Sequence, residues 1–172
     1  MSRFVVPALP KVIPQDKANA GWFAAACMLA HWRQRRGILA HNDNNMTEAH
    51  RHRADTSLPL DDMRRLAGAF GLSQVPPVHP VPSPMMLEQW LRRYGPLWTD
   101  AVRVDGNGLL TDRGHVVVIG GVDTTPAAPR IYVLDPWPNE RGHEGWRPYN
   151  QLHSLLVARD EKPRKICFLS HP

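Results

Sequence analysis

Hydrophobic residues recur at helical spacing in the first part of the chain. Over residues 21–36, small and large apolar side chains fall three or four positions apart, which predicts a helix that Gly37 would close. A second helix is expected over Leu60–Phe70, which begins with two acidic residues and ends before Gly71. Ser83 followed by Pro84 is typical of a helix start and predicts a third helix over Met85–Arg93.

From Gly95 onwards the pattern changes to short runs of β-branched and aromatic residues that end in turn signals. The expected strands are Leu97–Val104, His115–Ile119, Ile131–Leu134 and Ile166–Leu169, with Gly120 and Gly121 ending the second of them. Helices followed by strands predict an α+β fold in which a helical half packs on an antiparallel sheet. We expect one domain over 1–172, with its halves at about 1–94 and 95–172 and a cleft between them.

The remaining segments read as connections. Residues 1–14 contain three prolines and are expected to form an extended arm that lies across the domain. Residues 38–57 are polar and rich in His and Asn, which predicts a long loop. Val75–Pro84 is rich in proline and is interpreted as a connector between helices.

The charge pattern gives little support for a nucleic-acid partner. The net charge is +5, but the arginines are scattered in small groups beside predicted helix ends. Cations near helix C-termini complement the helix dipole, so a solvated positive surface is the simpler interpretation. No run of about 18 apolar residues is present, so we expect no membrane span and no membrane partner.

The N-terminus lacks the apolar stretch of a secretory signal. If the protein leaves its cell, it is expected to do so as a delivered effector by a route that the sequence does not encode, or as a piece of something larger. Otherwise a cytoplasmic location is expected.

Cys27 and Cys167 lie far apart in the chain, each between apolar neighbours. Buried thiols are the default for such positions, and a disulfide between them stays an open alternative. Cys27 would lie in the middle of the first helix, whereas a reactive thiolate favours a helix N-terminus, where the dipole lowers its pKa. We therefore do not expect Cys27 to act as a nucleophile.

Three residues could support acyl-transfer chemistry. His115 begins a predicted strand, so its ring would project from a strand end beside the cleft. Asp135 ends the next strand and could orient the ring of His115. Gln15 carries an amide that could donate to a developing oxyanion, and Trp137 could shield the His–Asp contact from water. Each has an ordinary structural alternative, and only the ordered set is informative.

The chain resembles bacterial papain-like cysteine peptidases of the effector and toxin kind, similar to the AvrRpt2-like and C39-like families. Three blocks carry the resemblance: Gln15–Met28, Leu87–Trp98 and Gly114–Trp137. In the papain-like family a glutamine lies six residues before the nucleophilic cysteine, and a tryptophan often follows that cysteine. The resemblance implies that Gln15 is the oxyanion residue, His115 the general base and Asp135 its orienting group, with no cofactor and a protein or peptide substrate.

The chain departs from the family at the nucleophile, because Gly21 stands six residues after Gln15 and before Trp22. The resemblance thus implies a peptidase scaffold that is inactive as written, either inactivated or a natural pseudoenzyme that uses its cleft to bind proteins. An immunity protein or a delivery partner is a further implication of the resemblance. A weaker alternative is a metal site at His41, Asp43, His50 and His52, although such histidines are usually solvated and we expect no bound metal.

Overall fold

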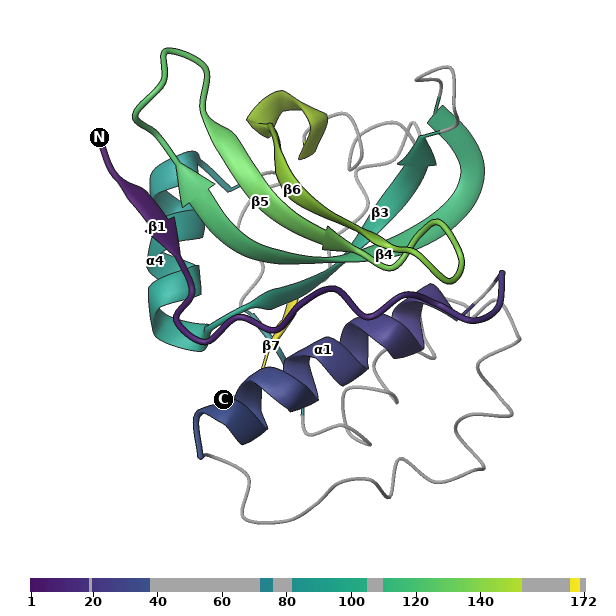
Figure 1. The fold of residues 1–172 in the computed structure, drawn as a ribbon. Coiled ribbons are helices and arrows are strands. Elements are labelled where there is room, and N and C mark those ends of the chain that lie inside the picture. Colours follow the sequence, from purple (N-terminus) through teal and green to yellow (C-terminus); the bar gives the residue numbers. More distant parts are fainter. Residues whose placement is uncertain (19, 38–71, 76–81, 105–109, 153–167, 171–172) are drawn as a thin grey trace.

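The computed structural model describes residues 1–18, 20–37, 72–75, 82–104, 110–152 and 168–170, and Figure 1 shows their arrangement. Its helices are α1 (Gly21–Arg35) and α4 (Pro84–Tyr94). Its strands are β1 (Arg3–Val5), β2 (Ser73–Gln74), β3 (Leu97–Val104), β4 (Leu110–Asp123), β5 (Arg130–Asp135), β6 (His143–Pro148) and β7 (Phe168–Ser170). All strand pairs are antiparallel, in the order β2-β7-β3-β4-β5-β6, with β1 paired to β4. The predicted α+β class is confirmed.

Strand β4 connects two hydrophobic clusters because successive side chains of a strand point to opposite faces. Val116 and Val118 belong to a cluster that includes Trp22, Met28 and Leu29 of α1. Val117 and Ile119 belong to a second cluster with Leu87 and Leu91, the two buried residues of α4. The continuous β-branched run 116–119 is therefore apolar because both faces of this strand are covered.

Helix α1 forms as the spacing predicts. Nine of its fifteen residues are buried, and many of these are alanines, which allow the helix to approach the sheet closely. The last turn carries Arg33 and Arg35, which complement the dipole. Gly37 follows the helix with a φ of +65°, the left-handed conformation in which glycine is favoured, so the predicted helix stop is confirmed.

The prediction for α4 is also confirmed at both ends. The Ser83 hydroxyl accepts a hydrogen bond from the backbone N–H of Met86 at 3.2 Å, and Pro84 occupies the first turn. Gly95 ends the helix with a φ of +82°. A Cβ atom at this position would lie 2.2 Å from the ring of Trp32, so glycine is required here both by its conformation and by close packing.

The two glycines after Ile119 do not end the strand, and this expectation was wrong. Strand β4 continues to Asp123, with an irregularity in its pairing between Ile119 and Gly121. A Cβ atom at Gly121 would lie 2.8 Å from the backbone oxygen of Phe4 in β1. Gly121 therefore allows another backbone to approach the strand, while Gly120 leaves room for the side chain of Leu9.

The N-terminal segment contributes more than the predicted extended arm. Residues Arg3–Val5 pair with the end of β4 as strand β1. The segment then runs alongside α1 in the opposite direction before it turns into the start of that helix (Figure 1). Strand β6 was also missed, and β7 lies slightly later than the predicted strand Ile166–Leu169.

Several predictions lie outside the described residues. These are the loop 38–57, the helix Leu60–Phe70 and the position of Cys167. Within the described part of the chain, no helix is long and apolar enough to cross a membrane.

Candidate active site

Gly21 is the first residue of α1, and it lies beside two of the predicted site residues, Gln15 and His115. A Cβ atom added there would lie 2.9 Å from Oε1 of Gln15 and 3.7 Å from Nδ1 of His115. The structure therefore brings together residues from the N-terminal segment, from α1 and from β4. A side chain at position 21 would lie at a helix N-terminus, where the dipole favours an anion.

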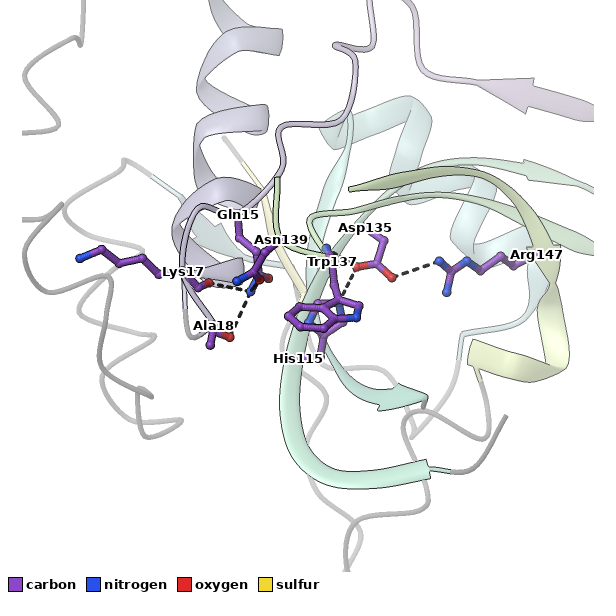
Figure 2. A network of polar contacts seen from close by, with 8 residues as sticks. All are labelled: Gln15, Lys17, Ala18, His115, Asp135, Trp137, Asn139 and Arg147. Carbon is purple, nitrogen blue, oxygen red and sulfur yellow. Dashed lines mark hydrogen bonds and ion pairs between the residues drawn. The ribbon is translucent and has the colours of Figure 1, made fainter. Parts of the chain in front are cut away.

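Figure 2 shows the polar network that surrounds this point. The Nε2 atom of His115 lies 2.5 Å from Oδ1 of Asp135, which is the last residue of β5. Val118 is paired with Leu134, so the antiparallel register places Asp135 opposite Val117. His115 is two residues from Val117 along β4, so the pairing of β4 with β5 brings His115 and Asp135 within hydrogen-bond reach of each other.

We expected His115 at a strand end, and this expectation was wrong. It lies within β4, five residues after the first residue of the strand. Its orientation is thus set by strand pairing on one side to Ala101 of β3 and by the Asp135 carboxylate on the other side. A ring held in this way has little freedom to turn away from position 21.

The Asp135 carboxylate has three hydrogen-bond partners. Its Oδ1 accepts from the backbone N–H of Trp137 at 2.9 Å as well as from His115, and its Oδ2 accepts from Arg147 of β6 at 3.0 Å. Burial alone would raise the pKa of Asp135, but the His115 contact, the Trp137 N–H and the Arg147 charge together lower this pKa below its ordinary value. Asp135 is therefore ionised at neutral pH.

An ionised carboxylate only accepts hydrogen bonds, and this determines the tautomer of neutral His115. The Nε2–H donates to Asp135, which leaves the lone pair on Nδ1. Nδ1 is also the ring nitrogen nearest to position 21. The ring is thus arranged to accept a proton from a group placed at that position.

Gln15 is buried and held on several sides. Its backbone N–H donates to Pro136 O, and its backbone oxygen accepts from Glu140 N, so Gln15 is attached to the turn that follows Asp135. Its side-chain Nε2 donates to Lys17 O at 2.7 Å, to Ala18 O at 3.0 Å and to Asn139 Oδ1 at 3.0 Å (Figure 2).

These contacts turn the Gln15 amide away from the orientation expected of an oxyanion donor. The amide nitrogen faces two backbone carbonyls. If the nitrogen and the oxygen of the amide were exchanged, Oε1 would lie against these two carbonyl oxygens, and none of the three could donate a hydrogen bond. Oε1 therefore faces position 21, where it is buried without a hydrogen-bond partner among the described residues. Donation by Gln15 to an oxyanion stays a prediction that would require its side chain to move.

Two residues of this network were not found from the sequence. Arg147 lies on a strand that was not predicted, and no local pattern connects it with Asp135. Asn139 lies in the Trp137-Pro138 turn, whose proline-rich sequence indicated only a connection. Trp137 contributes its backbone N–H to Asp135, and its predicted shielding role stays a prediction.

Cys27 is partly exposed rather than buried, so that expectation was wrong. It lies in α1 six residues after Gly21, which is about 9 Å along the helix axis. Its thiol is therefore remote from the first turn of α1. Among the described residues no group of three or more His, Cys, Asp or Glu side chains could hold a metal ion, and the His41–His52 alternative lies outside them.

A model of the family described as papain-like cysteine protease AvrRpt2 matches residues 2–154. The chain belongs to this family. The match confirms the resemblance seen in the sequence, and with it a papain-like α+β fold and protein or peptide substrates as the class on which the family acts. A search of curated proteins gives no match.

Proposed function

We propose that this chain is a papain-like cysteine peptidase whose catalytic position is occupied by Gly21, and that it is inactive in thiol hydrolysis for this reason. The observation that carries the proposal is the position of His115: its Nδ1 lies 3.7 Å from where the Cβ of residue 21 would be. That distance suits a cysteine sulfur that exchanges a proton with the ring. Gln15, His115 and Asp135 would be the oxyanion, base and orienting residues.

With cysteine at position 21, each step has a group to perform it. His115 Nδ1 takes the thiol proton, the sulfur attacks the peptide carbonyl carbon, and the imidazolium gives its proton to the leaving amine. Asp135 stabilises the imidazolium while it exists. Water then adds to the thioester with His115 as base, which releases the carboxylate and restores the thiol.

With glycine, the first step has no nucleophile. Asp16, close in sequence, is exposed and carries a weakly nucleophilic carboxylate. Removing the nucleophile from a catalytic unit of this type lowers turnover on the order of a million-fold. The chain as written should therefore show no thiol-dependent hydrolysis.

Thiol labelling of a Gly21→Cys variant tests this proposal. The thiol at position 21 should react with iodoacetamide about ten-fold or more faster than Cys27, because the helix N-terminus and His115 favour its thiolate. Positions 21 and 27 lie in one tryptic peptide, residues 18–33, so tandem mass spectrometry assigns the label to either cysteine from the fragment ions. The fast reaction should disappear when His115→Ala is added, and equal labelling rates at Cys27 and position 21 would contradict the proposal.

A second candidate function is a protein-binding module, and the orientation of Gln15 favours it. Oε1 of Gln15 and the lone pair of His115 Nδ1 both face position 21, so this point presents two acceptors. Such a pair suits a donor group, for example an N–H of a bound peptide. In this interpretation the cleft binds a peptide segment without cleaving it.

Binding measurements distinguish the two candidates. A peptide that the Gly21→Cys variant cleaves would be titrated against the glycine form, with Gly21→Leu as the variant that fills the site. Saturable binding that Gly21→Leu abolishes supports the binding module. Cleavage by the cysteine variant without measurable binding to the glycine form supports an inactivated peptidase alone.

We further propose that the protein acts as a bacterial effector or toxin domain that is delivered out of its cell, with an immunity protein or delivery partner. Only its likeness to the effector and toxin peptidases supports this. Growth of a bacterial host that expresses the Gly21→Cys form, compared with the glycine form and with Gly21→Cys/His115→Ala, tests it. Growth inhibition by the cysteine form alone is the expected result, and equal growth of all three would count against a toxic activity.

A further inference from the structure

A basic cavity of about 380 Å³ lies at the other end of α1 from Gly21. Its walls come from the last turn of α1, the last turn of α4 and the N-terminal segment. The charged and aromatic residues that line it are Arg33, Arg36, Arg92, Arg93, Phe4, Trp32 and Tyr94. The length of α1 places this cavity about 20 Å from the candidate active site.

Two of the arginines are positioned by aromatic rings. The guanidinium carbon of Arg92 lies 4.1 Å from the centre of the Phe4 ring, and that of Arg93 lies 5.1 Å from the centre of the Tyr94 ring. A guanidinium that lies over a ring is held in place while its N–H edges remain available to an oxyanion. Less side-chain entropy is then lost when a ligand binds.

Charges of the opposite sign reduce the positive potential but do not cancel it. Glu88 accepts from Arg92 at 2.7 Å and also contacts Ser2, so one arginine is paired. The C-terminal ends of α1 and α4 together contribute about one negative charge. No acidic residue lines the cavity, and among the described residues Arg36 and Arg93 have no carboxylate partner. Arg36 and Arg93 alone exceed this dipole contribution by about one positive charge.

We propose that this cavity binds a compact anion with two or more phosphate or carboxylate groups. Arg36 and Arg93 line the same cavity, and two guanidiniums suit several charged oxygens better than a single one, because each can make two parallel hydrogen bonds to an oxyanion. This binding site does not depend on the proposed peptidase function, since it shares no residue with the network around position 21.

Isothermal titration with inorganic pyrophosphate tests the proposal on the full chain. The ionic strength is held constant with sodium chloride, because exposed charges are screened by salt. Arg36→Gln and Arg93→Gln, alone and together, remove charges at exposed positions. Arg141→Gln, an exposed arginine in the turn before β6, is the matched control. Circular dichroism shows whether each variant is folded.

We expect saturable binding of pyrophosphate, a dissociation constant raised on the order of ten-fold by each cavity substitution, and no change in Arg141→Gln. A parallel titration with citrate identifies the source of the oxygens: binding of both anions supports a general oxyanion site, and binding of pyrophosphate alone supports a phosphate ligand. Absence of saturable binding, or equal binding by the double variant and the natural chain, would overturn the proposal.

If the double variant fails to fold, Phe4→Leu provides the second test. It keeps all four charges but removes the ring that holds Arg92. Weaker pyrophosphate binding by Phe4→Leu, with unchanged binding by Arg141→Gln, supports the proposal. Unchanged pyrophosphate binding by both Phe4→Leu and Arg141→Gln would contradict the proposal that the Arg92 guanidinium, held by Phe4, binds the anion.

Discussion

The two sides of position 21 differ in how they are built. On the sheet side, His115, Asp135 and Arg147 come from three neighbouring strands and form a connected set of contacts. On the other side, Gln15 comes from a segment between β1 and α1, and its unpartnered oxygen faces the vacant position. Strand pairing preserves the sheet side whether or not a nucleophile is present, whereas the Gln15 side chain has adopted contacts that a cysteine would disturb.

The largest expected effect comes from restoring the missing side chain. Gly21→Cys should raise peptide hydrolysis on the order of a million-fold over the glycine form, because in the proposed mechanism it supplies the missing nucleophile. A fluorogenic peptide or a protein substrate gives the rate. A matched Gly21→Ser variant, whose hydroxyl has a much higher pKa, should remain near the rate of the glycine form. Equal rates for the serine and cysteine forms would contradict a thiolate mechanism.

Removing the contacts of Asp135 with His115 and Arg147 should mainly lower the stability of the folded protein. Asp135→Asn removes the charge that balances Arg147 and the acceptor that orients His115. Leaving Arg147 partly buried without its carboxylate should lower the free energy of unfolding by about 2–3 kcal/mol. Urea denaturation followed by tryptophan fluorescence measures the change. A double variant with Arg147→Met should recover part of the loss, and no recovery would show that the two side chains are not coupled.

The same carboxylate predicts how stability depends on pH. Asp135 has a lowered pKa in the folded protein, so its contribution is present above about pH 4, the ordinary value in the unfolded chain, and is lost as pH falls through the folded value. Urea denaturation at a series of pH values should show that the free energy of unfolding falls as the pH is lowered below about 4. The acid-dependent loss should be smaller in Asp135→Asn, and identical pH profiles would contradict the assignment.

The smallest expected effect comes from the Gln15 side. Asn139→Ala removes one of three acceptors of the Gln15 amide, and Lys17 O and Ala18 O still hold it. The free energy of unfolding should fall by about 1 kcal/mol. In the Gly21→Cys form, the same substitution should not lower the rate of hydrolysis and should raise it if Asn139 restrains Gln15. A strong loss of activity would instead show that Asn139 takes part in substrate or oxyanion binding.

The sequence predicted the elements whose signals are local. The cap at Ser83, the stop at Gly37 and the β-branched run 116–119 each depend on neighbouring residues, and each was predicted correctly. Strand β6 pairs with the preceding strand, but it was missed because its sequence contains a glycine and a proline and no run of β-branched residues. Strand β1 was missed because its stability comes from pairing with the distant end of β4. For the same reason, the sequence indicated that Gln15, His115 and Asp135 belong together but could not show which way the Gln15 amide faces. That orientation depends on Asn139 and two backbone carbonyls.

The attachment of Gln15 has a practical consequence. The residue lies on a connection between β1, which is paired into the sheet, and α1, so both ends of this connection are anchored. A proteolytic cut between residues 7 and 14 would leave both anchors in place, and the backbone hydrogen bonds of Gln15 to Pro136 and Glu140 would still hold it against the turn at 136–140. Limited digestion of this segment should therefore leave the two fragments associated.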